Sequence, residues 1–213
     1  METADLQDLR QALLSASDAV IAAEPLLTRT DTVIGDGDHG ITMKRGFSVL
    51  KEELAESRFD SPFALFHACG ISLVKSMGGS SGVLFGTLFI GGLAEITGLT
   101  ELDGNALRAY LCGGIRAVIK RGKARAGDKT MVDALLGAEE YMQRLPRGET
   151  GAERILRAAA DGAREGAEQT KAMLPRLGRA RNFREQALGV PDPGALSVAI
   201  LLDGMASALE ARA

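Results

Sequence analysis

Apolar residues recur at intervals of three and four along most of this chain, which is the spacing of one face of an α-helix. The first stripe contains Leu6, Leu9, Leu13 and Val20 and predicts an amphipathic helix over about residues 5–23. The same periodicity predicts further helices over about residues 41–57, 61–77, 82–96, 103–121, 130–144, 149–174 and 194–211. The alanine-rich segment 149–174 is expected to be the longest of them.

Local signals at the ends of these segments support the helical interpretation. Ser61 followed by Pro62 is typical of a helix start, because serine caps free N–H groups and proline fits the first turn. Asp103 can cap a later helix in the same way. No segment alternates apolar and polar residues strictly enough to predict a strand, and the composition shows no break along the chain. The pattern therefore predicts an all-α fold in which residues 1–213 form a single domain, a bundle of about eight helices.

Composition narrows the classes of protein to consider. The chain has 213 residues, of which 46% are hydrophobic, 25% charged and 4% aromatic, and its formal net charge is −3. This balance is typical of a globular protein, and the weak negative charge and the scarcity of aromatic rings argue against nucleic acid as a partner. The most apolar run, about residues 82–93, is too short to cross a membrane, and the acidic N-terminus does not resemble a signal peptide. We therefore expect a cytoplasmic protein without a membrane anchor.

An acidic loop between the first two predicted helices carries the strongest chemical signal. Asp31, Asp36 and Asp38 lie within eight residues of one another and are interleaved with glycines that let the backbone turn tightly. Three carboxylates held close together repel one another unless a cation lies between them. Mg²⁺ prefers such oxygen ligands, and it completes its coordination shell with water and phosphate. The alternative interpretation is a solvated turn in which Asp38 caps the next helix.

Two known loop motifs resemble this segment but do not fit it. The spacing Gly35-x-Gly37-x-x-Gly40 matches the dinucleotide-binding fingerprint, but no predicted strand precedes it. Two aspartates inside the loop would also repel a bare pyrophosphate. An EF-hand that starts at Asp36 needs an acidic residue at its twelfth position, where Phe47 stands. Both motifs are therefore excluded.

Glycine-rich breaks between later helices are candidates for further parts of a site. The run 78–82 precedes an apolar helix, and free N–H groups at a helix N-terminus favour phosphate, although a plain turn between helices explains the same residues. The sequence contains no P-loop consensus. Turn-type segments also occur at 127–133, 178–180 and 192–195. If successive helices run in opposite directions, alternate junctions lie at the same end of the bundle and can form one site.

Taken together, these segments resemble one known family. The matching segments are Asp31, Ile34-Gly-Asp-Gly-Asp-His-Gly40, Arg45-Gly-Phe47, Gly78-Gly-Ser-Ser-Gly82, Gly127-Asp-Lys-Thr-Met-Val-Asp-Ala-Leu135, Gly178-Arg-Ala180 and Asp192-Pro-Gly-Ala195. In this order and at these spacings they are similar to the nucleotide-binding L subunits of dihydroxyacetone kinases. The resemblance covers about residues 5–211. Each segment alone is unspecific, but the combination is highly specific.

The resemblance implies a barrel of eight antiparallel helices with a nucleotide, ADP or ATP, at one end. It implies that two Mg²⁺ ions bridging the nucleotide's phosphates are ligated by Asp31, Asp36 and Asp38. The residues that it implies around the nucleotide are His39, Gly40, Ile41, Thr42, Gly79, Ser80, Ser81, Gly122, Met131, Arg179, Asp192, Pro193 and Gly194. No protein nucleophile is implied, because metal ions and positioning are sufficient for phosphoryl transfer.

The resemblance also implies a function and its partners. The chain would be a kinase subunit that passes a phosphoryl group to a small ketose on a separate K subunit, and a phosphohistidine on a third protein would rephosphorylate the bound ADP. Two alternatives stay open: an ATP-exchanging subunit of a related tetrose or ketose kinase, and a nucleotide-loaded regulatory module that binds a transcription factor. A homodimer is compatible with the resemblance. Residues 181–187 depart from the family pattern, which leaves partner recognition and the phosphoryl donor open.

Overall fold

The structure is a computed structural model that describes residues 2–146 and 148–212. These residues form nine α-helices, four short 3-10 helices and two short strands. The α-helices are α1 (Leu6–Ala22), α2 (Glu24–Ile34), α3 (His39–Glu56), α4 (Pro62–Met77), α5 (Gly79–Ile90), α6 (Gly104–Gly122), α7 (Met131–Arg144), α8 (Ala152–Gln169) and α9 (Pro193–Glu210). The other elements are β1 (Thr3–Asp5), β2 (Glu101–Asp103), η1 (Leu93–Ile96), η2 (Thr170–Ala172), η3 (Arg179–Asn182) and η4 (Arg184–Ala187).

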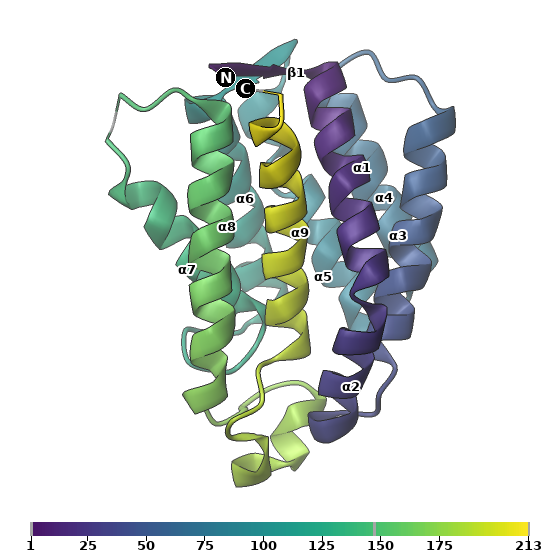
Figure 1. The fold of residues 1–213 in the computed structure, drawn as a ribbon, viewed down its shortest axis with the longest axis vertical. Coiled ribbons are helices and arrows are strands. Elements are labelled where there is room, and N and C mark those ends of the chain that lie inside the picture. Colours follow the sequence, from purple (N-terminus) through teal and green to yellow (C-terminus); the bar gives the residue numbers. More distant parts are fainter. Residues whose placement is uncertain (1, 147, 213) are drawn as a thin grey trace.

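Eight of these helices form a closed ring, and the remaining one, α2, follows α1 at one end of the ring (Figure 1). Each helix from α3 to α8 packs against the next, α9 packs against α8, and α1 closes the ring between α9 and α3. Successive helices of the ring run in opposite directions, so both termini lie near β1 at one end, while α2 and the segment between α8 and α9 lie at the other (Figure 1). The predicted all-α fold of about eight antiparallel helices is confirmed. That residues 1–213 form a single domain stays a prediction.

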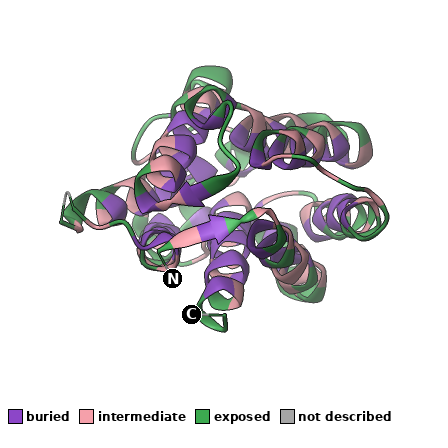
Figure 2. Ribbon diagram, turned by 90° about the horizontal axis from the view of Figure 1, so that it is seen from above, coloured by how far each residue is buried: buried purple, intermediate pink, exposed green. Residues whose placement is uncertain are grey.

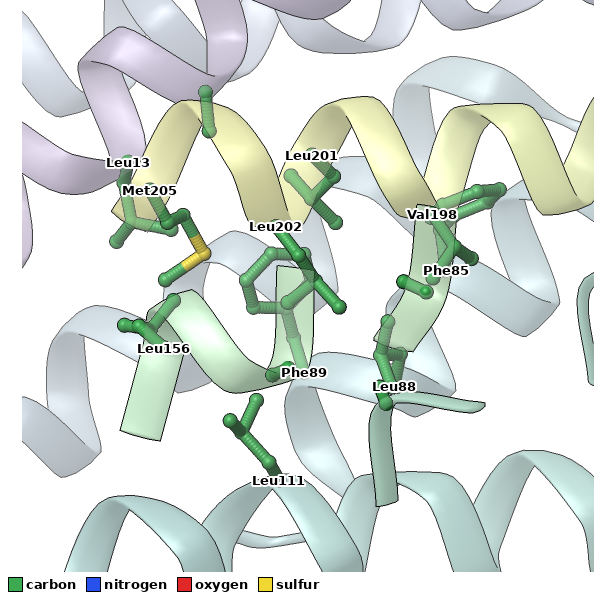
Figure 3. Packing of buried hydrophobic residues seen from close by; sticks show 14 of the residues in the cluster. Leu13, Phe85, Leu88, Phe89, Leu111, Leu156, Val198, Leu201, Leu202 and Met205 are labelled. Carbon is green, nitrogen blue, oxygen red and sulfur yellow. The ribbon is translucent and has the colours of Figure 1, made fainter. Parts of the chain in front are cut away.

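The ring encloses one core, to which all eight helices contribute apolar side chains. Seen from above, the buried residues of the helices face the inside of the ring (Figure 2). In the close view, Phe89 of α5 lies between Leu202 of α9 and Leu111 of α6 (Figure 3). The Tyr110 hydroxyl donates a hydrogen bond of 2.9 Å to the Phe89 carbonyl, so the polar end of this buried ring is satisfied. A continuous core of this kind fixes the helix ends, and the loops between them, relative to one another.

The structure adds a helix, α2, where the sequence predicts only a polar connection. Pro25 lies in the first turn of α2, where a missing N–H group costs nothing, so it begins this helix rather than separating α1 from a loop. Leu27 and Ile34 are fully buried on the inner face of α2. The apolar positions of this helix are too few for its periodicity to be recognised among the polar residues.

Two predicted boundaries are wrong for reasons of packing. The helix expected over 82–96 is α5, which begins at Gly79 and ends at Ile90, and η1 follows it. A Cβ atom at Gly92 would lie 2.0 Å from the Tyr110 carbonyl oxygen, so the chain between α5 and η1 approaches α6 more closely than a side chain allows. The helix expected over 149–174 is α8, which ends at Gln169, because the Thr170 hydroxyl bonds the Ala167 carbonyl at 2.5 Å and η2 follows. The longest helix is therefore α6, with 19 residues.

The two strands were not predicted either. They pair antiparallel with Thr3 opposite Asp103, and three residues are too short to show an alternating pattern. Two segments, Gly79–Ile96 and Pro193–Glu210, are long and apolar enough to cross a membrane by length and composition alone. Both contribute to the core, and core helices of globular proteins meet the same criterion, so this is weak evidence for a membrane span.

Candidate functional site

A cavity of about 760 Å³ opens at the end of the ring where α2 lies. Four connections surround it, and they join α2 to α3, α4 to α5, α6 to α7, and α8 to α9. These connections meet because helices of alternating direction place every second junction at the same end (Figure 1). Loops distant in the sequence thus meet around one cavity at an end of the bundle, as the alternating helix directions would allow.

Three carboxylates form a cluster on one wall of the cavity. Asp31 belongs to the last turn of α2, and Asp36 and Asp38 lie in the connection to α3. One oxygen atom of each lies within 4.8 Å of the others, so a single cation can contact all three. Asp31 is buried and accepts the backbone N–H of His39 at 3.1 Å, whereas Asp36 and Asp38 are exposed. A set made only of carboxylate oxygens suits a hard divalent cation such as Mg²⁺.

The alternative interpretation of this loop is a solvated turn in which Asp38 caps the next helix, and its capping part does not agree with the structure. Asp38 occupies the N-cap position of α3, but its side chain makes no capping hydrogen bond to the described residues. It lies 3.5 Å from the Arg179 guanidinium instead, and Arg179 also forms an ion pair with Asp36. Arg179 belongs to η3 in the connection between α8 and α9. The protein thus brings a positively charged side chain of its own to the cluster, from a connection distant in the sequence.

His39 begins α3 beside the carboxylate cluster. Its Nε2 atom lies 2.8 Å from the Ser197 hydroxyl oxygen of α9, and that hydroxyl donates to the Pro193 carbonyl at 2.9 Å. Burial lowers the pKa of His39 below its ordinary value, against the opposing effects of the Asp31 carboxylate and the Pro193 carbonyl. The His39 imidazole therefore connects the start of α3 to the start of α9.

Two residues expected around the nucleotide do not line the cavity. Gly40 packs against α2, where a Cβ atom would lie 2.3 Å from the Thr28 hydroxyl oxygen, and Ile41 is 57% exposed. The other expected residues all belong to the cavity wall, and they are His39, Thr42, Gly79, Ser80, Ser81, Gly122, Met131, Arg179, Asp192, Pro193 and Gly194. On a helix, consecutive residues point in different directions, so a run of four cannot all face one ligand.

The turn between α4 and α5 forms a second part of the cavity wall. Gly78 and Gly79 adopt φ of +70° and +59°, a conformation that residues with a Cβ atom rarely tolerate. This turn aims the free N–H groups at the start of α5, together with Ser80 and Ser81, at the cavity. Arg45 fixes the turn from α3, because its guanidinium donates to the carbonyls of Ser76 at 3.0 Å and Met77 at 2.5 Å, the last residues of α4.

The start of α9 forms a third wall. Asp192 caps α9 by accepting the N–H of Ala195 at 2.8 Å. Burial raises the pKa of Asp192 to about 7, with nearby Asp133 acting in the same direction, and the Ala195 N–H and the Lys129 ammonium oppose this rise. Met131, at the first turn of α7, lies next to Gly194 and adds an apolar surface. The cavity thus combines a polar half, suited to phosphate and metal, with a partly apolar half.

Sequence reasoning assigned no role to Lys129, although this residue also lines the cavity. It is only 1% exposed and donates to the carbonyls of Thr170 at 2.5 Å and Val190 at 2.6 Å. Arg45 and Arg121 are further cavity residues without a predicted role. A lysine in a Gly-Asp-Lys-Thr turn is ordinarily solvated, so no local signal predicted its burial.

The chain is similar to several known proteins. The family model described as "DAK2 domain" matches residues 33–207. The chain belongs to the DAK2 domain family. It is 38% identical over 181 residues to the "PEP-dependent dihydroxyacetone kinase 2, ADP-binding subunit DhaL" of Listeria innocua, which covers 83% of this chain and 82% of that protein. The corresponding Escherichia coli subunit is also 38% identical, over 85% of this chain and 87% of that protein.

Other similar proteins are longer than this chain. The "D-erythrulose kinase" of Mycolicibacterium smegmatis is 35% identical over 89% of this chain, but the chain spans only 33% of its length. The dihydroxyacetone kinase of C. freundii, solved in its native form and with AMP-PNP and Mg²⁺, superposes with a TM-score of 0.73 at 28% identity. The superposition covers 93% of this chain and about a third of that one. The family and the fold expected from the sequence are therefore confirmed.

Proposed function

We propose that this protein is the nucleotide-carrying subunit of a dihydroxyacetone-type kinase and holds Mg-ADP or Mg-ATP in the cavity. One observation carries the proposal: the cluster of Asp31, Asp36 and Asp38 lies in the same cavity as the N-terminus of α5. A helix N-terminus attracts phosphate, whereas three carboxylates repel it unless a metal ion lies between them. A single ligand that satisfies both features is a nucleotide polyphosphate with bound divalent metal.

The donor set fits Mg²⁺. Asp31, Asp36 and Asp38 would hold the ions, two of them by resemblance to the family, and the ions would neutralise the phosphate charge when bound. Ser80 and Ser81 would donate to phosphate oxygens together with the first N–H groups of α5. Two names among the relatives support this ligand, because one refers to an ADP-binding subunit and another to AMP-PNP with Mg²⁺.

The apolar half of the cavity would hold the base. Leu84, Val118 and Met131 lie on its wall, and Gly122 leaves room between α6 and α5. Flat aromatic bases gain from such surroundings, because burying them removes apolar area from water. The wall formed by Asp192, Pro193 and Gly194 would complete the site next to Met131.

The ketose would be bound by a K subunit, and the phosphoryl group would come from a phosphohistidine protein through bound ADP. The relatives that match over most of both chains favour this donor, since they are named PEP-dependent or PTS-dependent ADP-binding subunits. A second candidate is an ATP-exchanging erythrulose kinase, which the identity of 35% to the D-erythrulose kinase supports. Retention of ADP through purification distinguishes them, because a fixed ADP suits rephosphorylation in place and a freely exchanged nucleotide suits ATP.

Calorimetric titration with ADP tests the nucleotide site. We expect binding in the presence of Mg²⁺ and none with EDTA. The double variant Asp36→Ala with Asp38→Ala should weaken binding by more than roughly a hundredfold, since even partners outside the ligand shell contribute up to about that factor. The matched control is Glu52→Ala with Glu56→Ala, which removes two exposed carboxylates from the distant end of α3. Equal affinity of the Asp36/Asp38 variant and the control would disprove the proposal.

A further inference from the structure

The connection between α8 and α9 is a long loop whose two ends lie close together. Residues 171–189, which we call the flap, contain η3 and η4 and bring Leu177 and Arg179 to the cavity wall. The two ends of the flap lie side by side, because the Gly189 N–H donates to the Lys171 carbonyl at 2.8 Å. Just outside them, the Asp192 N–H donates to the Thr170 hydroxyl at 2.8 Å. The flap is thus a loop closed at its base.

Lys129 of the connection between α6 and α7 ties this base together. Its ammonium donates to the Thr170 carbonyl on the incoming side and to the Val190 carbonyl on the outgoing side. The side chain is almost fully buried, and its backbone has a φ of +59°, which is uncommon for a residue with a Cβ atom. One side chain therefore spans the base of the flap and lines the cavity at the same time.

Burying a lysine at this position is costly, and the surroundings compensate for it. Burial lowers the pKa of Lys129, and the Asp192 and Asp133 carboxylates oppose this effect. Asp133 is itself fixed, because its oxygens accept the N–H groups of Gly127 at 2.6 Å and Thr130 at 2.8 Å. A methionine would fill the same space without a buried charge. Unlike methionine, the ammonium can donate hydrogen bonds to two carbonyls in separate segments of the chain.

Beyond its base, the flap makes few hydrogen bonds and packing contacts with the rest of the described chain. The Arg176 N–H donates to the Asp128 carbonyl at 3.1 Å, and Leu177 is partly buried against the main core. Ala180 and Ala187 pack on Ile34 in a small cluster separate from that core. Segments with few buried contacts open at lower free-energy cost than a core does. Opening of the flap would withdraw Arg179 from Asp36 and uncover the cavity.

We propose that Lys129 is a positioning residue that holds the base of the flap closed and thereby slows the release of bound nucleotide. The inference rests on the proposed function, since it concerns the nucleotide in this cavity. Lys129 acts through the two carbonyls and not on the reacting phosphate. Its loss frees the two ends of the flap, so the flap opens more often and ADP leaves faster.

Two measurements test this, with Lys129→Met as the main variant. The first is the dissociation rate of a fluorescent ADP analogue with Mg²⁺, which we expect to rise at least tenfold. The second is limited trypsin digestion of the nucleotide-free protein, because Arg176, Arg179, Arg181 and Arg184 are exposed trypsin sites in the flap. Cleavage within the flap should accelerate, while cleavage elsewhere in the chain stays at the wild-type rate. A general loss of stability would accelerate cleavage everywhere.

Two further variants complete the test. Lys171→Met removes an exposed ammonium that pairs only with Glu168 among the described residues, and it should change release by less than twofold. Thr170→Val removes the hydroxyl that accepts the Asp192 N–H, so it loosens the same base without touching Lys129 and should also accelerate release. If Lys129→Met does not fold, the dissociation rate measured for Thr170→Val tests the inference instead. If the folded variants release the ADP analogue at the wild-type rate, the inference about Lys129 is wrong but the proposed function still stands. If the wild-type protein has no affinity for Mg-ADP, the proposed function itself is disproved.

Discussion

Arg179 and Asp36 form an ion pair across the mouth of the cavity and so join the flap to the loop that follows α2. Both side chains are substantially exposed, at 61% and 43%. The guanidinium neutralises part of a cluster in which three carboxylates would otherwise repel one another. It therefore competes with a metal ion for the same oxygens.

This competition predicts the effect of Arg179→Ala on metal binding. Without nucleotide, the affinity for Mg²⁺ should rise about two- to fivefold, because an exposed ion pair contributes up to about 1 kcal/mol. Calorimetric titration with Mg²⁺ measures it. Arg181→Ala, which changes an exposed arginine of the same flap, is the control and should leave the affinity unchanged. Equal or weaker Mg²⁺ binding by Arg179→Ala would show that the arginine does not compete.

Ser80 and Ser81 at the start of α5 line the cavity. If they donate to the phosphates, the double variant Ser80→Ala with Ser81→Ala should bind ADP more weakly. Hydrogen bonds to charged groups contribute roughly 1.5–3 kcal/mol each, so a loss of about tenfold or more is expected even if one hydroxyl dominates. Titration of the double variant with ADP and Mg²⁺ measures it. Ser76→Ala serves as the control, because that hydroxyl bonds the Ser72 carbonyl within α4. A double variant that binds like Ser76→Ala would place the phosphates elsewhere in the cavity.

Asp192 predicts a pH dependence of stability. Its pKa rises from 3.8 to about 7 on folding, so between about pH 4 and pH 7 the folded chain keeps a proton that the unfolded chain releases. The contribution of this group to stability is therefore lost as the pH rises through that window. Asn also caps helices well, and it carries no charge that burial would disfavour at pH 8. The Asp192→Asn variant should therefore melt a few degrees higher than wild type at pH 8, since each kcal/mol in the free energy of unfolding shifts the melting temperature by roughly 2–4 °C.

Thermal melting of the nucleotide-free protein from pH 4 to pH 8 checks this. The difference in melting temperature between Asp192→Asn and wild type should grow with pH. Asp103→Asn makes the same exchange at the N-cap of α6, far from the cavity, and controls for the change of capping residue. A constant difference across the range would show that Asp192 does not titrate there.

The contact between α7 and α8 predicts a large effect of a small substitution. A Cβ atom at Gly162 would lie 2.1 Å from the Gly137 carbonyl oxygen, so alanine would force the two helices apart. Gly162→Ala should destabilise the protein by about 1–3 kcal/mol despite the better helix propensity of alanine. Urea unfolding measures the loss. Gly148→Ala is the control, because a Cβ atom there meets nothing within 4 Å, and equal stability of the two variants would contradict the close packing.

The sequence predicted most of the helices because their apolar stripes are long and regular. It missed α2, whose residues are mostly polar, and it extended α8 through Thr170, where a hydroxyl competes with the helix hydrogen bonds. It predicted the carboxylate cluster because all three aspartates lie in one short segment. It gave no indication of the role of Lys129, since the carbonyls that this lysine bonds lie 41 and 61 residues away.

By itself, the sequence determined the helical periodicity and the acidic loop, because each of these depends on neighbouring residues. It also determined the order of segments that is typical of the family, because that order is a property of the linear chain. The tertiary structure alone decided that Asp36 meets Arg179, that Gly40 faces α2 instead of the cavity, and that Lys129 is buried at the base of the flap. Those relationships depend on how eight helices close into a ring. Packing of distant surfaces, and not local conformational preference, sets that closure.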